Sequence, residues 1–174
     1  MPKNIFLKPI KYLKNRIFGI CCLLKGFPVQ IDEIFTAVRI NMRNFLYHRR
    51  PMLVVDVLEK ISVNCVEVSV AIRSDMPFVG ENGYFDPAGY MELMAQSAAP
   101  LVLLGENGRL RNISAAYLVG GRNIKISGGA SAGDLLRIGL SKKESYGKYF
   151  VFEGTVKRDA ECLAAGEITL WAER

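Results

Sequence analysis

One long apolar helix that carries a single acid constrains this chain more than any other feature. The stretch FDPAGYMELMAQSAAPLVLL spans residues 85–104, and Asp86 with the proline after it is typical of a helix start. Pro100 should bend the last turn, because proline has no N–H to donate to the carbonyl of Gln96. A helix that is apolar nearly all round must be buried on most sides. Glu92 on this helix, one turn before Gln96, is therefore on the surface, held by hydrogen bonds, or placed to act on a substrate.

Two strand-like runs precede this helix and four follow it. Residues 64–74 alternate between apolar and polar side chains, which is typical of a strand with one buried face. The full set of predicted strands is 51–61, 64–74, 112–127, 133–143, 148–158 and 161–173. Two strands, one helix and four strands indicate an α+β fold. We expect a six-stranded antiparallel sheet wrapped around the one long central helix, since this arrangement buries both.

The first part of the chain differs in charge from the rest. Residues 1–41 hold seven Lys and Arg against two acids, whereas the other 16 basic and 15 acidic residues nearly balance. We expect a basic, partly apolar arm over residues 1–45 and one folded domain over residues 46–174. The arm lies on a membrane surface or on a partner, or is loosely ordered, or precedes a functional chain that begins near Met42. Its apolar run is shorter than the ~20 residues that cross a bilayer, and the nearly neutral domain does not favour nucleic-acid binding.

Four cysteines and one histidine leave little scope for metal chemistry. Cys21, Cys22, Cys65 and Cys162 form no CxxC pair, and His48 alone cannot complete a zinc site. The two adjacent cysteines are poor disulfide partners. We therefore expect reduced thiols, a cytoplasmic location, no metal and no other cofactor.

Three segments carry a resemblance to a known family. They are HRRPMLVVDVLEK (48–60), YMELMAQSAA (90–99) and GRNIKISGGASAGDLLRIGL (121–140). In order and spacing they resemble the hotdog-fold 3-hydroxyacyl-acyl-carrier-protein dehydratases, most closely the branch of aryl-polyene and related lipid gene clusters. The resemblance covers roughly residues 46–173. It implies a hotdog fold, a dimer whose sheets join edge to edge, and acyl-pantetheine tunnels at the subunit interface.

The resemblance also implies site residues. In the family, a histidine and a carboxylate from opposite subunits remove water from a 3-hydroxyacyl thioester. Glu92 matches the carboxylate of the helix motif, and Gln96 matches the glutamine that holds it in place. The best-known members carry the histidine in a Gly-His-Phe-Pro loop, which corresponds here to residues 75–87 and contains no histidine. His48 lies instead in the His-Arg-x-Pro start of the first strand.

Water elimination needs a base for the C2 proton and an acid for the C3 hydroxyl. We predict His48 as the base, because the two arginines after it disfavour the imidazolium form. Glu92 would be the acid, and the two side-chain tips should then lie within about 8 Å of each other in the dimer. Gly89 or Ala88 would offer a helix N-terminal N–H to the thioester carbonyl.

The resulting hypothesis is a dehydratase-like protein that converts 3-hydroxyacyl groups on an acyl carrier protein into 2-enoyl thioesters. It would work as a homodimer, or as a heterodimer with a related hotdog protein. Because the loop histidine is absent, a non-catalytic subunit that completes an active homologue is one alternative, and an acyl thioesterase is another. A DNA-binding regulator is a third, although 41 residues before the domain leave poor room for a helix pair.

Overall fold

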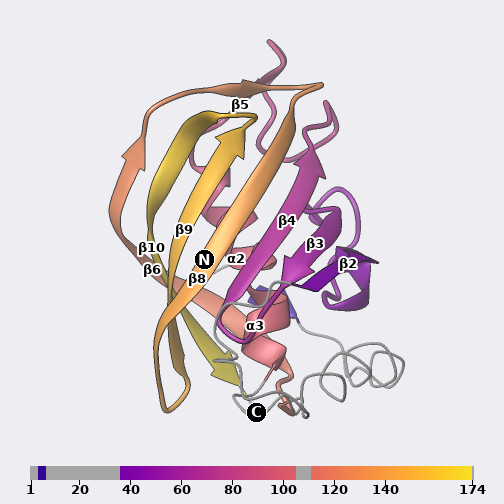
Figure 1. Ribbon diagram of the computed structural model, residues 1–174. Helices are drawn as coiled ribbons and strands as arrows, with labels where there is room; N and C mark the ends of the chain where they lie inside the picture. The colour runs from indigo at the N-terminus through magenta and orange to yellow at the C-terminus, as the bar shows by residue number, and fades with distance from the viewer. Residues whose placement is uncertain (1–3, 7–35, 105–110, 174) are drawn as a thin grey trace.

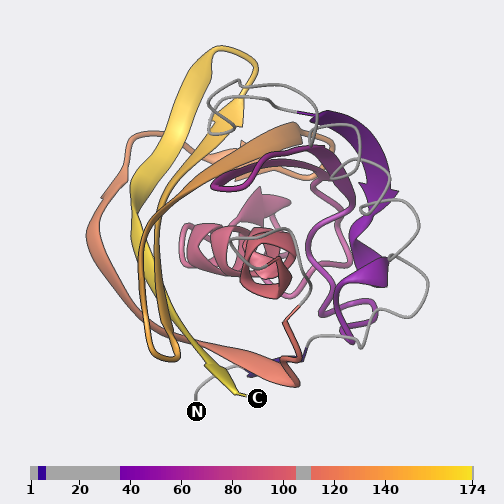
Figure 2. The ribbon, with the colours of Figure 1, turned by 60° about the horizontal axis from the view of Figure 1, so that its bottom comes forward.

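A strongly curved antiparallel sheet surrounds a bent helix (Figures 1 and 2). The computed structural model describes residues 4–6, 36–104 and 111–173. The sheet has eight strands in the order β1-β6-β10-β9-β8-β4-β3-β2, and every neighbouring pair is antiparallel. The strands are β1 Asn4–Phe6, β2 Thr36–Asn41, β3 Val57–Ile61, β4 Cys65–Ala71, β6 Ala115–Ile126, β8 Leu135–Tyr146, β9 Tyr149–Arg158 and β10 Glu161–Glu173.

The predicted helix forms, and it is bent where Pro100 requires. It consists of α2 (Gly89–Ser97) and α3 (Ala99–Leu103), with the proline in the first turn of α3. The ladder resumes when the N–H of Val102 donates to the carbonyl of Ala98 over 3.0 Å. Nearly every residue of both segments is buried, as expected for a helix that is apolar on all sides. None of the described helices combines the length and apolarity needed to span a membrane.

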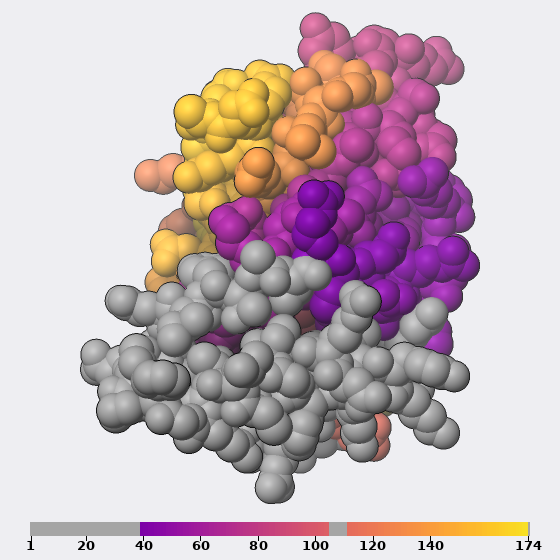
Figure 3. Space-filling view, turned by 45° about the vertical axis from the view of Figure 1, so that its right-hand side comes forward, coloured from indigo at the N-terminus to yellow at the C-terminus, as the bar shows by residue number. Residues whose placement is uncertain are grey.

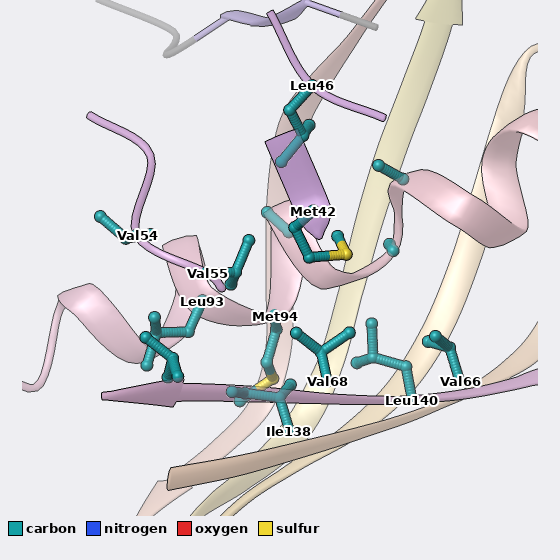
Figure 4. Packing of buried hydrophobic residues seen from close by; sticks show 14 of the residues in the cluster. Met42, Leu46, Val54, Val55, Val66, Val68, Leu93, Met94, Ile138 and Leu140 are labelled. Carbon is teal, nitrogen blue, oxygen red and sulfur yellow. The ribbon is translucent and has the colours of Figure 1, made fainter. Parts of the chain in front are cut away.

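Apolar side chains from the sheet and from the segment before β3 enclose the helix. The alternation predicted for residues 64–74 is confirmed, since Val66, Val68 and Val70 are buried and their neighbours along β4 are partly exposed. Figure 4 shows Leu93 and Met94 of α2 together with Val66, Val68 and other buried side chains of the same cluster. Each fully buried side chain of this size stabilises the fold by about 1.5–3 kcal/mol.

The α+β hotdog architecture is confirmed, but the strand count is larger than the six predicted. β1 and β2 add one strand at each edge of the sheet, and both come from the predicted arm. A separate two-stranded sheet joins β5 (Tyr84–Phe85) to β7 (Ala130–Ser131). These strands are too short or too irregular for periodicity to reveal. Residues 42–44 of the predicted arm form a short 3-10 helix, and its residues 1–3 and 7–35 lie outside the described residues.

The first predicted strand was too long. Residues 51–56 are not part of a strand, and β3 begins only at Val57. Leu53, Val54 and Val55 are nevertheless buried, so the apolar pattern was read correctly as core. The backbone groups of Met52, Leu53 and Val54 bond to side chains of other elements, as described below, whereas the N–H of Asp56 donates to the carbonyl of Ser69 in β4 over 3.2 Å.

Candidate functional site

The centre of the candidate site is a buried carboxylate–amide pair on α2. Glu92 is 4 % exposed and Gln96 is 0 % exposed. The Nε2 of Gln96 donates to Oε1 of Glu92 over 2.8 Å. No described residue donates a hydrogen bond to the second oxygen, Oε2. One carboxylate oxygen is thus held by Gln96, and the other accepts no hydrogen bond from the described residues.

Gln96 also ties the helix to the segment that precedes β3. Its Nε2 donates to the carbonyl of Met52 over 2.9 Å, and its Oε1 accepts from the N–H of Val54 over 3.1 Å. Both amide hydrogens and the amide oxygen are therefore used. A buried amide group must satisfy its hydrogen bonds within the protein. The Gln96 side chain therefore holds the backbone of residues 52–54 beside α2.

Two arginines hold the remainder of this segment. Arg49 donates from Nη1 to the carbonyls of Leu46, Tyr47 and His48, over 3.2, 3.0 and 2.7 Å. Arg73 donates from Nη2 to the carbonyl of Leu53 over 3.2 Å. The backbone around His48 is thereby fixed from several directions.

Asp56 completes this support. Its carboxylate accepts from Arg73 Nη1 over 3.2 Å and from the N–H of Ala71 over 2.9 Å. The acid thus joins the end of the segment to β4, which is a hydrogen-bonding role rather than a chemical one.

The structure places the predicted base and acid on two elements that are linked by Gln96. His48 is half-buried and lies four residues before Met52, whose carbonyl accepts from Gln96. Glu92 lies one turn before Gln96 on α2. The convergence of the two side-chain tips in a dimer involves a second subunit, so it stays a prediction.

The helix start differs slightly from the one predicted. Asp86 accepts from the N–H of Ala88 over 2.8 Å through its side chain and from the N–H of Gly89 over 2.8 Å through its carbonyl. The helix itself begins at Gly89, with Ala88 as the N-cap residue. Both N–H groups that were predicted to bind a thioester carbonyl therefore donate to Asp86. A role in substrate binding stays a prediction and requires that a substrate replace one of these bonds.

Gly89 has a packing reason to be glycine. A Cβ atom at this position would lie 2.4 Å from Cζ of Phe85 and 2.8 Å from Cγ of Phe78. The rings of these two phenylalanines meet edge to face, with centroids 5.9 Å apart. The first residue of α2 therefore packs directly against the rings of Phe78 and Phe85.

Sequence reasoning missed a polar cluster beside the helix start. The hydroxyl of Tyr90 donates to the carbonyl of Gly128 over 3.2 Å, and Arg158 donates to the carbonyl of Gly129 over 3.3 Å. Arg158 also pairs with Asp134 over 2.8 Å. Burial raises the pKa of Tyr90 above its usual value, which keeps the hydroxyl protonated as a donor. The glycine pair after β6 was the available signal, because glycines often mark a close backbone approach.

The sheet carries a groove on its outer face, away from Glu92. Its volume is about 560 Å³, and residues of β2, β3, β4 and β8 line it. Figure 3 views the molecule from the side on which β2, β3 and β4 lie. Most charged groups that line it pair with one another: Arg39 with Glu59, and both Lys60 and Arg137 with Glu67. The remaining one, Asp56, pairs with Arg73. These mutual ion pairs are typical of a solvated surface and give no group that is poised for chemistry.

A curved antiparallel sheet around a buried central helix defines a hotdog-fold protein. The chain belongs to the ApeP-like family, described as ApeP dehydratase, whose family model matches residues 40–173. The family assignment agrees with the resemblance read from residues 48–60, 90–99 and 121–140. A comparison with curated proteins found no match.

Solved structures show the same fold. A chain of the dehydratase heterocomplex ApeI:P from Xenorhabdus doucetiae is similar with a TM-score of 0.69 and 21% identity, over 79% of this chain and 93% of that chain. The uncharacterized protein PH1136 from Pyrococcus horikoshii has a TM-score of 0.55 and 18% identity, over 79% and 95%. A hypothetical thioesterase with coenzyme A from Streptococcus pneumoniae TIGR4 has a TM-score of 0.52 and 13% identity, over 67% and 84%.

Proposed function

We propose that this protein is a subunit of a dehydratase that removes water from 3-hydroxyacyl groups carried by an acyl carrier protein. The observation that carries the proposal is the buried Glu92, which is oriented by Gln96 through one oxygen while the other accepts no bond from the described residues. A carboxyl group held this way has a fixed direction and little water around it. A fixed direction suits general acid catalysis, because the acid must lie within hydrogen-bond reach of the group that it protonates.

The reaction assigns one task to each residue. A base removes the C2 proton, the C2–C3 double bond forms, and the C3–O bond breaks as Glu92 delivers a proton to the leaving hydroxyl. The products are water and a 2-enoyl thioester. His48 is the base that this chain itself offers, and the bonds from Arg49 to the neighbouring carbonyls hold its backbone in place.

A second hotdog subunit is part of the proposal. β1 covers only Ala115–Tyr117 of β6, and no described strand lies beside the rest of that edge. Val119 and Ile126 on β6 are 53 % and 51 % exposed. An open edge with exposed apolar side chains favours pairing with another strand. The partner is either a second copy of this chain or a related hotdog protein, and the second choice is favoured by the similarity to a dehydratase heterocomplex.

The test uses the full chain, alone and co-purified with a related hotdog protein that carries the loop histidine. Each preparation is incubated with a 3-hydroxyacyl group on acyl carrier protein, and the carrier is followed by intact-mass analysis. Loss of one water from the carrier supports the proposal. Release of free acid and free thiol would indicate a thioesterase instead. Turnover by the pair that survives both Glu92→Gln and His48→Gln in this chain would indicate a non-catalytic subunit.

A further inference from the structure

A segment between β6 and β8 lies beside the start of α2. It comprises residues 127–134, here called the strap, and it includes β7. β7 pairs with β5, so that Ala130 lies opposite Phe85 and Ser131 lies opposite Tyr84. The strap is therefore bonded to the residues that lead into the helix.

Tyr90 connects the strap to the helix itself. Its side chain is fully buried, and its hydroxyl donates to the carbonyl of Gly128 over 3.2 Å. Its ring packs against that of Phe85, with centroids 5.5 Å apart. Tyr90 precedes Glu92 by two residues in the first turn of α2. The turn that carries the acid is thus held by the strap, while Gln96 holds the carboxylate.

Backbone bonds fix the two ends of the strap. The N–H groups of Ser127 and Gly128 donate to the carbonyl of Leu163 in β10, over 2.8 and 3.2 Å. At the other end, the N–H of Gly133 donates to the carbonyl of Ile72 over 2.8 Å. The middle of the strap depends instead on β5 and on one side chain of β9.

That side chain is Arg158. Its Nη1 donates to the carbonyl of Gly129 over 3.3 Å and to Oδ2 of Asp134 over 2.8 Å. The same carboxylate oxygen accepts from the N–H of Ser131 over 2.9 Å. Nη2 donates to Glu161 over 2.7 Å. The planar fork of arginine suits several acceptors at once, and here it joins both halves of the strap to the start of β10.

We propose that Arg158 is a positioning residue for the dehydration. It keeps the middle of the strap in place, and the strap fixes the first turn of α2 through Tyr90 and so the position of Glu92. The inference rests on the proposed function, because the task of Glu92 belongs to that reaction. A displacement of a catalytic group by about 1 Å can cost about 100-fold in rate, so a hold on this turn affects the chemistry.

The first test measures kcat and KM for water loss from a 3-hydroxyacyl carrier protein, with the full chain purified together with its hotdog partner. Arg158→Gln should lower kcat at least about tenfold and change KM much less, because it displaces the acid and not the carrier surface. Lys157→Gln is the matched control. It makes the same charge change one residue away, on the opposite face of β9, and should keep the wild-type kcat. A wild-type kcat in Arg158→Gln would overturn the proposal.

A double-mutant cycle separates positioning from a general loss of stability. Tyr90→Phe removes only the hydroxyl that reaches the strap, so it should also lower kcat. Because both residues act through the strap, the double variant should lose little more than the worse single variant. Val66→Ala creates a cavity in the core on β4 and should lower the melting temperature without lowering kcat. Losses that multiply in the double variant, or an equal loss in Val66→Ala, would contradict positioning.

Hydrogen exchange tests the same link without any turnover. In the folded protein the N–H of Gly89 donates to the carbonyl of Asp86 over 2.8 Å, and that of Tyr90 donates to the carbonyl of Pro87 over 3.1 Å. Arg158→Gln should speed the exchange of both amides at least about tenfold, whereas Lys157→Gln should not. Unchanged exchange would overturn the proposal.

The two measurements distinguish the two claims. If wild type and its partner release no water from the carrier, the proposed function fails, and with it any role of Arg158 in that reaction. Faster exchange in Arg158→Gln would then still show that Arg158 holds the start of α2. If wild type is active and Arg158→Gln is equally active, the proposed function stands and the positioning role is wrong.

Discussion

Gln96 donates to Glu92 over 2.8 Å and, from the same nitrogen, to the carbonyl of Met52 over 2.9 Å. The orientation of the carboxylate is therefore coupled to the segment that carries His48. A shift of either element would therefore move the other through the side chain of Gln96.

This coupling predicts a large effect of Gln96→Leu. The substitution would leave the carbonyl of Met52 and the N–H of Val54 without their partner, although the side-chain volume is similar. We expect a loss of about 2–3 kcal/mol in the free energy of unfolding, because unsatisfied buried groups are costly. Chemical denaturation measures it.

The neighbouring Ser97 supplies the control for this experiment. Its Oγ is buried and makes no hydrogen bond with the described residues. Ser97→Ala removes a polar atom that has no partner there, so stability should stay the same or rise slightly. If Gln96→Leu is as harmless as Ser97→Ala, then Gln96 does not hold the two elements together.

The start of α2 should not tolerate a methyl group at Gly89. A Cβ there would lie 2.4 Å from Phe85, a ring that is itself buried. Gly89→Ala should therefore destabilise the fold by about 1–3 kcal/mol through overpacking. Gly120→Ala on β6 is the control, since nothing lies within 4 Å of its would-be Cβ. Similar melting temperatures for the two variants would contradict this packing.

Stability should fall in acid partly through Asp134. The N–H of Ser131 and then Arg158 hold the pKa of Asp134 below its ordinary value of 3.8, against a partial opposition from burial. Since the folded-state pKa is the lower one, the carboxylate stabilises the fold above pH 3.8 and loses this contribution as pH falls through the folded value. Asp134→Asn should therefore lower stability near neutral pH, and its difference from wild type should shrink below about pH 4.

Denaturant midpoints across this pH range provide the measurement. Glu153→Gln removes an exposed carboxylate that forms no ion pair with the described residues, so it should change little at any pH. A deficit of Asp134→Asn that is constant from neutral pH to about pH 3 would exclude the electrostatic explanation.

The sequence predicted those parts of the fold in which one periodicity decides the structure. Residues 64–74 alternate between apolar and polar side chains, so β4 was predicted. Residues 85–104 are apolar on nearly all sides, so the buried helix was predicted. Residues 51–56 show the limit of this reasoning. They are as apolar as a strand, but their backbone groups bond to Gln96 and Arg73, which are distant in sequence.

The candidate site was predictable to a similar degree. Glu92 and Gln96 are one turn apart on a helix, so their contact follows from helix geometry alone. The bonds from Gln96 to Met52 and Val54 span more than 40 residues, and no local pattern reveals them. The ring contacts of Arg111 with Phe150 and of Lys148 with Trp171 also join positions that are distant in sequence, so no local pattern predicted them.

The most direct test of the proposed mechanism is water elimination by Glu92→Gln. The substitution keeps the shape of the side chain and an oxygen that can accept from Gln96, but it removes the proton donor. The variant, purified with its hotdog partner, is compared with wild type by intact-mass analysis of a 3-hydroxyacyl carrier protein. We predict that wild type forms the dehydrated carrier while the folded variant loses at least about 100-fold in rate. Elimination at the wild-type rate by Glu92→Gln would contradict the assignment of Glu92 as the acid.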